Sequence, residues 1–69
     1  MKDGLYLIEM GKKIRATRKA KGISLRQLTV MTGMHKSALS EIENGKRNSY
    51  LLTLKLIADT LNVDVKDFL

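Results

Sequence analysis

Three glycines punctuate the first two thirds of this chain. Gly22, Gly33 and Gly45 each follow a segment with helical apolar periodicity by one or two positions, where a helix end often needs a residue with positive φ. The sequence has no proline and no long alternation of apolar and polar residues, so strands are not indicated. The glycines therefore predict an all-α fold with at least three helices before residue 46.

The expected helix starts agree with these ends. Ser24 and Gln27 have the spacing of a capping box, in which the hydroxyl and the amide each satisfy a free backbone N–H at the helix entrance. Asp64 and Asp67 form a looser version before a last short helix. The pattern predicts a compact five-helix bundle with helices at residues 8–21, 25–32, 36–44, 50–61 and 65–69.

Residues 1–9 are interpreted as an N-terminal extension, of undetermined structure, of a single domain, 1–69. Within this extension, residues 5–8 read Leu-Tyr-Leu-Ile. Four apolar residues in a row can lengthen the first helix, form a short strand or pack against a second copy of the chain. The sequence leaves these alternatives open.

The length and composition exclude several classes of function. A chain of 69 residues buries only about 60% of the surface that it exposes when unfolded, and a ligand pocket of ordinary size would consume its core. The sequence shows no nucleophile paired with a base and no glycine loop that could cradle a phosphate. We therefore expect neither an enzyme nor a small-molecule substrate or cofactor.

Cysteine is absent, which excludes disulfides and thiolate metal sites. The single histidine, His35, has no partner of its own kind to complete a metal site. The apolar run near the N-terminus is too short for a signal peptide or a membrane span. We expect a cytoplasmic chain without a bound metal and without a membrane contact.

The charge is strongly uneven along the chain. The net charge is +6, and residues 1–36 hold nine Lys/Arg against two Asp/Glu, whereas residues 37–69 hold four against five. One basic half and a sequence pI near 9.9 are the electrostatic footprint of a nucleic-acid binder. A well-solvated basic surface is the alternative, because small domains need net charge for solubility.

Two of the expected helices, 25–32 and 36–44, are short and are joined by a turn that contains Gly33. Such a pair has the build of a helix-turn-helix. The second helix of such a pair can protrude while the first braces it, and a protruding helix fits the major groove of B-DNA. The spacing therefore predicts double-stranded DNA as the partner.

The residues resemble the phage-repressor/Cro-like helix-turn-helix family, also called the XRE family, across about residues 10–69. The resemblance is carried by Gly11-Lys-Lys-Ile14-Arg-Ala-Thr-Arg18, Gly22-Ile-Ser24, Leu28, Gly33-Met34, Leu39, Ile42-Glu43-Asn44-Gly45-Lys46 and Leu54-Lys-Leu-Ile57-Ala58-Asp-Thr-Leu61-Asn-Val63. It implies a DNA-binding transcriptional regulator: a phage-type repressor, a controller of a restriction–modification operon, or a small chromosomal or mobile-element regulator. An antitoxin of the same fold would also bind a toxin protein.

Three positions depart from the family pattern. Leu25 stands where the family usually has a glutamine that often reaches a phosphate, so one backbone contact is in doubt. Thr29 stands where a small alanine is favoured, and His35 stands where serine or threonine commonly caps the next helix.

The two glutamates of segment 36–44 are expected on nearly opposite faces. If the position of Leu39 around the helix axis is set at zero, Glu43 lies at about 40° and Glu41 at about 200°, counting 100° per residue. The same counting on the first helix turns Arg18 inward. We expect Arg18 and Glu43 to form a largely buried, bidentate ion pair, as the resemblance also implies, because a carboxylate in a core needs a partner. Two ordinary surface charges are the alternative.

The outward face is expected to read bases. Lys36 suits guanine O6 and N7, Ser37 suits less selective contacts, and Glu41 can accept a hydrogen bond from a cytosine N4 amino group; an exposed spectator is the alternative for Glu41. Contacts to the DNA backbone are expected from the loop after this helix and from the basic first helix. The residues are Asn44, Lys46, Arg47, Asn48, Ser49, Lys12, Lys13, Arg15 and Lys19.

The C-terminal third holds more apolar residues than one helix face needs. Leu52 and Leu56 share a flank that lies apart from the expected core stripe, and Val65, Phe68 and Leu69 follow close by in sequence. These residues predict a homodimer, since paired units read a two-fold operator. The rival from another class is an adaptor that binds proteins through the same helical fold without reading DNA.

Overall fold

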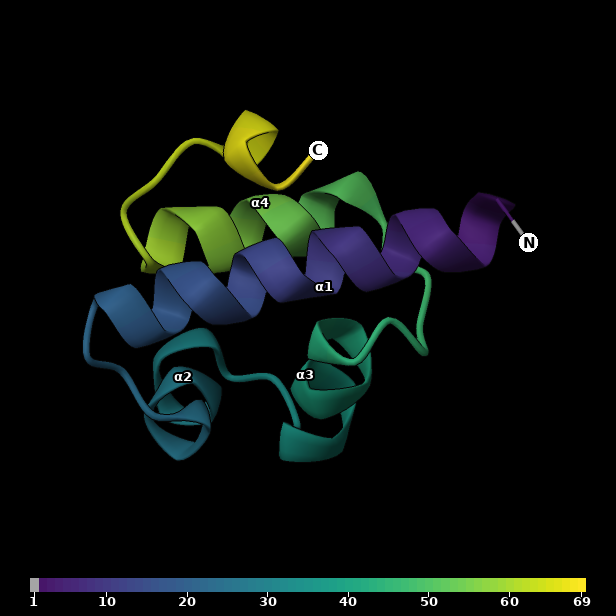
Figure 1. Cartoon of the computed structure of the whole chain (residues 1–69). Helices are drawn as coiled ribbons and strands as arrows, with labels where there is room; N and C mark the ends of the chain where they lie inside the picture. Colours follow the sequence, from purple (N-terminus) through teal and green to yellow (C-terminus); the bar gives the residue numbers. More distant parts are fainter. Residues whose placement is uncertain (1) are drawn as a thin grey trace.

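The computed structural model describes the backbone of residues 2–69 and the side chains of residues 4–69. The element order is α1 (Lys2–Ala20), α2 (Leu25–Thr32), α3 (Lys36–Glu43), α4 (Leu51–Thr60) and the 3₁₀ helix η1 (Val65–Phe68). α1 packs against α3 and η1, α2 packs against α3 and α4, and α4 packs against η1. In the view of Figure 1 the long α1 lies across the molecule, with α2 and α3 below it and α4 and η1 above it.

The all-α prediction is confirmed, but the prediction of five helices is wrong: residues 2–69 form four α-helices, and the last segment is a 3₁₀ turn. In η1 the Asp67 N–H donates to the Asp64 carbonyl at 2.9 Å and the Leu69 N–H to the Lys66 carbonyl at 3.1 Å. These bonds join residues three apart, which is the 3₁₀ pattern. A segment of four residues is too short to close a ladder of α-helical bonds.

The predicted bounds of the helix-turn-helix agree closely with the structure. Segment 25–32 coincides with α2, and α3 ends one residue before the predicted end. The capping box is present: the Ser24 hydroxyl accepts from the Gln27 N–H at 3.0 Å, and the Gln27 amide oxygen accepts from the Ser24 N–H at 2.8 Å. Two free N–H groups at the start of α2 are thereby satisfied.

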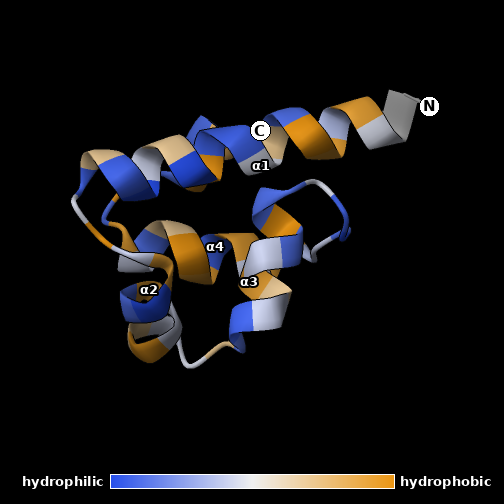
Figure 2. Ribbon diagram, turned by 60° about the horizontal axis from the view of Figure 1, so that its bottom comes forward, coloured by the Kyte–Doolittle hydropathy of each residue, from blue (hydrophilic) through white to orange (hydrophobic). Residues whose placement is uncertain are grey.

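The segment at residues 5–8, which the sequence left open, is helical. α1 begins at Lys2, so residues 2–9 are its first turns. Leu5, Tyr6 and Ile8 are exposed there, and Leu7 packs against the core. Figure 2 shows hydrophobic positions, in orange, near the N-terminal end of α1.

The core takes residues from every element. Its buried side chains are Met10, Ile14, Leu28, Leu39, Ile42, Leu54, Ile57, Ala58, Leu61 and Phe68. Phe68 is 1% exposed, so the prediction that it contributes to a contact between copies is wrong. η1 packs on both α1 and α4, and this docking turns the aromatic ring into the bundle.

Two searches of the described residues bear on function. No helix among them is both long enough and apolar enough to cross a membrane. No cluster of three or more His, Cys, Asp or Glu side chains that could hold a metal ion occurs in the same part of the chain.

α1 approaches the end of α3 so closely that no side chain fits between them. A Cβ atom on Gly11 would lie 2.5 Å from the carbonyl oxygens of Ile42 and Glu43. Both obstructing atoms belong to the backbone, so they cannot swing aside as a flexible side chain would. Gly11 therefore sets the distance between α1 and α3.

We predict that Gly11→Ala destabilises the chain by about 1–3 kcal/mol, the usual cost of forcing extra atoms into a packed contact. Gly4→Ala in the same helix is the control, because nothing lies within 4 Å of its added Cβ. That substitution should raise stability by about 0.5–1 kcal/mol through helix propensity. Urea unfolding measures both, and equal effects of the two substitutions would contradict the contact.

Candidate nucleic-acid interface

The turn between α2 and α3 is fixed by its own hydrogen bonds. Gly33 has φ 77°, and its N–H donates to the Thr29 carbonyl at 2.8 Å. The Thr32 hydroxyl donates to the Leu28 carbonyl at 2.8 Å and accepts from the Met34 N–H at 3.1 Å. The short connection thus has a defined path, and it places α3 at a set angle to α2.

α3 has a buried face and an exposed face. Leu39 and Ile42 are buried in the core, whereas Lys36, Ser37 and Glu41 are exposed. His35 occupies the N-cap position of α3 and makes no side-chain capping bond. Ser37 and Glu41, at about 160° and 200° from Leu39, therefore lie on the side of α3 that faces away from the bundle. Lys36, at about 60°, is exposed at the first turn of the helix.

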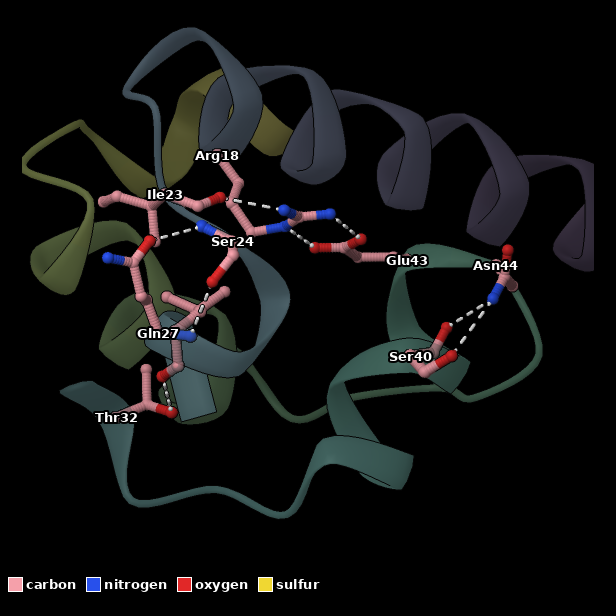
Figure 3. A network of polar contacts seen from close by, with 9 residues as sticks. Arg18, Ile23, Ser24, Gln27, Thr32, Ser40, Glu43 and Asn44 are labelled. Carbon is pink, nitrogen blue, oxygen red and sulfur yellow. Dashed lines mark hydrogen bonds and ion pairs between the residues drawn. The ribbon is translucent and has the colours of Figure 1, made fainter. Parts of the chain in front are cut away.

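Arg18 and Glu43 meet behind α3, as the helical angles predict. Arg18 Nε donates to Glu43 Oε2 at 2.7 Å and Arg18 Nη2 donates to Glu43 Oε1 at 3.0 Å, so the pair is bidentate (Figure 3). Arg18 Nη1 also donates to the Ile23 carbonyl at 2.9 Å. Each of the two charged residues is only 7% exposed.

The partner groups compensate for the burial of both charges. The hydrogen bond to Glu43 raises the pKa of the Arg18 guanidinium, and this effect outweighs burial, which acts in the opposite direction. The guanidinium thereby connects three parts of the chain: α1, the turn at Ile23 that leads into α2, and the last residue of α3. The pair holds α3 in place from the side opposite its exposed face.

We predict that Glu43→Ala lowers the free energy of unfolding by about 3–5 kcal/mol, because it leaves a buried guanidinium without its counter-charge. Glu9→Ala is the matched control, since Glu9 contacts Lys12 at 3.7 Å on the exposed surface; it should change stability by about 1 kcal/mol or less. Thermal or urea unfolding checks both values. An unchanged melting temperature in Glu43→Ala would rule out a stabilising pair.

Some side chains of the loop after α3 are hydrogen-bonded or buried, and others are exposed. The Asn44 side-chain amide donates to the Ser40 carbonyl at 2.8 Å and to the Ser40 hydroxyl at 3.3 Å (Figure 3). The Ser49 hydroxyl oxygen is buried and has no hydrogen-bond partner within the described residues. The Asn44 amide is thus engaged within the chain, and the Ser49 hydroxyl is not accessible at the surface. Lys46 and Asn48 are exposed.

Arg47, for which a phosphate contact is predicted, pairs with Glu41 in the structure. Its Nη2 lies 2.8 Å from Glu41 Oε1, and its Nε donates to the same oxygen at 2.9 Å. The side chains are 49% and 47% exposed. One residue expected to clamp the backbone and one expected to read a base thus form a single unit.

The cations of α1 do not share one face. Relative to Gly11, which faces α3, Arg15, Lys19 and Lys12 fall at about 40°, 80° and 100° around the helix. Lys13 falls at about 200° on the same scale, and its Nζ donates to the Leu69 carbonyl at 3.2 Å. Lys13 therefore lies on the side of η1, away from α3.

The sequence reasoning missed two residues of this region. Ser40 holds the Asn44 amide, and its angle of about 100° from Leu39 was the available signal. Arg26 is an exposed cation near the start of α2, directly after the departure at Leu25. Leu25 itself packs against the core, which accounts for an apolar residue at that position.

The residues proposed for a contact between copies differ in exposure. Leu52 is 79% exposed, Leu69 50% and Leu56 41%, while Val65 is half-buried against the core. Tyr50 and Leu51, at the start of α4, are also exposed. An apolar surface thus remains on α4 after Phe68 is removed from the set.

Comparison with known proteins gives consistent matches. A helix-turn-helix family model, HTH_3, matches residues 14–68. The chain is 42% identical over 59 residues to the HTH-type transcriptional regulator SlrR of Bacillus subtilis (strain 168), covering 84% of this chain and 39% of that protein. The chain therefore spans about two fifths of that relative's length.

Solved structures of regulatory proteins also match the chain. The restriction-modification controller protein C.AhdI from Aeromonas hydrophila matches with a TM-score of 0.87 and 28% identity, over 91% of this chain and 96% of that one. An HTH_3 family transcriptional regulator from Vibrio cholerae matches with a TM-score of 0.88 and 29% identity, over 96% and 37% of the two chains. The clp gene regulator ClgR from C. glutamicum matches with 0.88 and 27%, over 91% and 81%.

These proteins are regulators rather than enzymes, in agreement with the expectation from the sequence. The matched residues include both helices of the helix-turn-helix, the buried Arg18–Glu43 pair and the core of α4. The chain belongs to the HTH_3 helix-turn-helix family, the XRE-type family that its motifs resemble.

Proposed function

We propose that the chain is a sequence-specific regulator of transcription that binds double-stranded DNA and reads the major groove with α3. The observation that carries this proposal is the two-sided build of α3. Leu39, Ile42 and Glu43 are buried on one side, Ser37 and Glu41 are exposed on the other, and Lys36 is exposed at the leading end. A protruding helix with polar side chains fits the major groove.

The base contacts follow from the donors and acceptors of these side chains. Lys36 and Ser37 stand at the start of α3, where recognition helices contact base edges. The lysine ammonium suits the acceptors O6 and N7 of guanine, and the Glu41 carboxylate suits the N4 donor of cytosine. The same carboxylate disfavours sites that lack this donor, so it contributes to specificity at the expense of affinity.

Phosphate contacts are assigned to exposed side chains that form no hydrogen bond within the described residues; Lys12 has only a surface contact of 3.7 Å to Glu9. In the loop after α3 these are Lys46 and Asn48, and on α1 they are Lys12, Arg15 and Lys19. All five are exposed, and phosphate contacts of this kind fix register without reading sequence. Asn44, Ser49 and Lys13 are not assigned to the backbone, because Asn44 and Lys13 donate to other residues of the chain and the Ser49 hydroxyl is buried.

The chain is proposed to act as a homodimer on a two-fold operator. Leu52 and Leu56 lie one turn apart on an exposed flank of α4, and a stable interface needs about 800 Å² from each partner. Two copies related by a two-fold axis would present two α3 helices to half-sites about 34–36 Å apart. An adaptor or antitoxin that uses this apolar surface to bind another protein is the competing function.

The proposed function is tested by selecting bound sequences from a random DNA pool at two salt concentrations. We predict enrichment of a palindromic consensus, with affinity that falls steeply as salt rises, because phosphate contacts release counterions. Glu41→Gln should change which base is preferred at one position of each half-site. An absence of enrichment would favour the adaptor, and a uniform change in affinity in Glu41→Gln would count against base reading.

The proposed dimer is tested by sedimentation. We predict that Leu52→Lys weakens self-association by about tenfold or more, since a charge placed in an apolar interface loses its hydration. Val30→Lys is the matched control, because Val30 on α2 is also 79% exposed; it should leave self-association unchanged. A wild-type chain that stays monomeric at all concentrations, or equal effects of the two substitutions, would contradict the assigned surface.

A further inference from the structure

The chain reverses direction at the end of α3. Gly45 has φ 70°, its N–H donates to the Ile42 carbonyl at 3.2 Å, and the Lys46 N–H donates to the Glu41 carbonyl at 2.8 Å. This bonding pattern is a Schellman motif, which ends a helix with a residue in the left-handed conformation. A Cβ on Gly45 would also lie 2.6 Å from the Ile8 Cα, so the reversal is packed against α1.

The reversal returns the chain to the last turn of α3 and brings Arg47 beside Glu41, six positions earlier. Arg47 Nε and Nη2 both contact Glu41 Oε1, at 2.9 and 2.8 Å. Among the described residues, no hydrogen bond reaches Oε2. The guanidinium therefore binds one oxygen of the carboxylate and leaves the other without a hydrogen bond from the described residues.

We propose that Arg47 is a positioning residue that sets the base preference of Glu41, rather than a clamp on phosphate. It orients the carboxylate on the exposed face of α3 so that Oε2 is presented to a cytosine N4 amino group. This inference rests on the proposed function, because it needs α3 to lie in the major groove.

Two physical effects make such a residue useful. A free glutamate loses up to about 1.5–2 kcal/mol of rotamer freedom when a contact orders it, and a carboxylate that a guanidinium already holds has lost part of that freedom before DNA arrives. The positive charge of Arg47 also offsets the negative charge of Glu41 close to the phosphates. Glu41 can then reject wrong bases with a smaller loss of overall affinity.

Lys46 provides the matched comparison. It precedes Arg47 in the same loop and is exposed, and within the described residues no carboxylate lies within salt-bridge distance of its ammonium. A cation without a protein partner is the form expected of a phosphate contact. The two neighbours should therefore respond differently to substitution.

The experiment measures binding of the wild type, Arg47→Ala, Arg47→Lys and Lys46→Ala to the selected duplex and to a duplex altered at the base pair that Glu41 reads. We expect Arg47→Ala to reduce discrimination between the duplexes by about tenfold, a typical worth of one base contact, with a salt slope close to that of the wild type. Arg47→Lys keeps the positive charge but loses the two-nitrogen geometry of the guanidinium, so it should retain affinity for DNA better than discrimination between the two duplexes. Lys46→Ala should lower the salt slope by about 0.9 and keep discrimination.

The Glu41→Gln background shows whether Arg47 acts through Glu41. We expect Arg47→Ala to cause no further loss of discrimination there. The inference is overturned if Arg47→Ala lowers the salt slope as Lys46→Ala does while keeping discrimination, or if it costs the same discrimination in both backgrounds. A wild-type chain that enriches no DNA sequence would overturn the proposed function, and this inference with it. Thermal unfolding of each variant verifies that it is folded.

Discussion

The arrangement of the helix-turn-helix depends on one buried ion pair. Arg18 donates through two nitrogens to Glu43 and through a third to the Ile23 carbonyl, so one guanidinium joins α1, the entry to α2 and the end of α3. Burying the two charges costs desolvation energy, and removing one partner leaves the other buried without a counter-charge. The position of α3 is therefore set by the directed hydrogen bonds of this pair as well as by apolar contacts. The close approach at Gly11 allows the two helices to come near enough for this contact.

The two glutamates of α3 have separate roles because the helix turns about 100° per residue. Glu43 is held from behind by Arg18, and Glu41 is held at the front by Arg47. The surroundings of the two pairs differ: the first is buried and contributes to stability, whereas the second is half exposed and contributes little to it. The front pair is therefore free to serve recognition, which is the role that we propose for it.

The parts of the fold that follow from local periodicity could be predicted from the sequence. Helical angles alone turned Arg18 and Glu43 inward, and the capping box at Ser24 marked the start of α2. Phe68 could not be placed, since its burial depends on how η1 docks on α1 and α4 rather than on its neighbours in sequence. Residues 5–8 were undetermined because they are apolar in every direction around a helix.

The pairing of Arg47 with Glu41 was also beyond the sequence. It requires the chain reversal after Asn44, and a loop rich in polar residues reads equally well as a phosphate clamp. Asn44 and Ser49 were assigned to DNA for the same reason, although the structure directs the Asn44 amide to Ser40 and buries the Ser49 hydroxyl. The sequence shows that this loop is polar, but the partners of its side chains depend on the path of the backbone.

The central claim is that α3 is held from behind by Arg18 and Glu43 and contacts DNA with its opposite face. Nuclear magnetic resonance of the ¹⁵N-labelled chain, titrated with the selected duplex, tests it most directly. The account predicts that the backbone amide signals of Lys36, Ser37 and Glu41 shift on binding, while the Arg18 Nε–H signal keeps its position. Loss of the Arg18 signal, or shifts concentrated on α4 around Leu52 with none on α3, would contradict it.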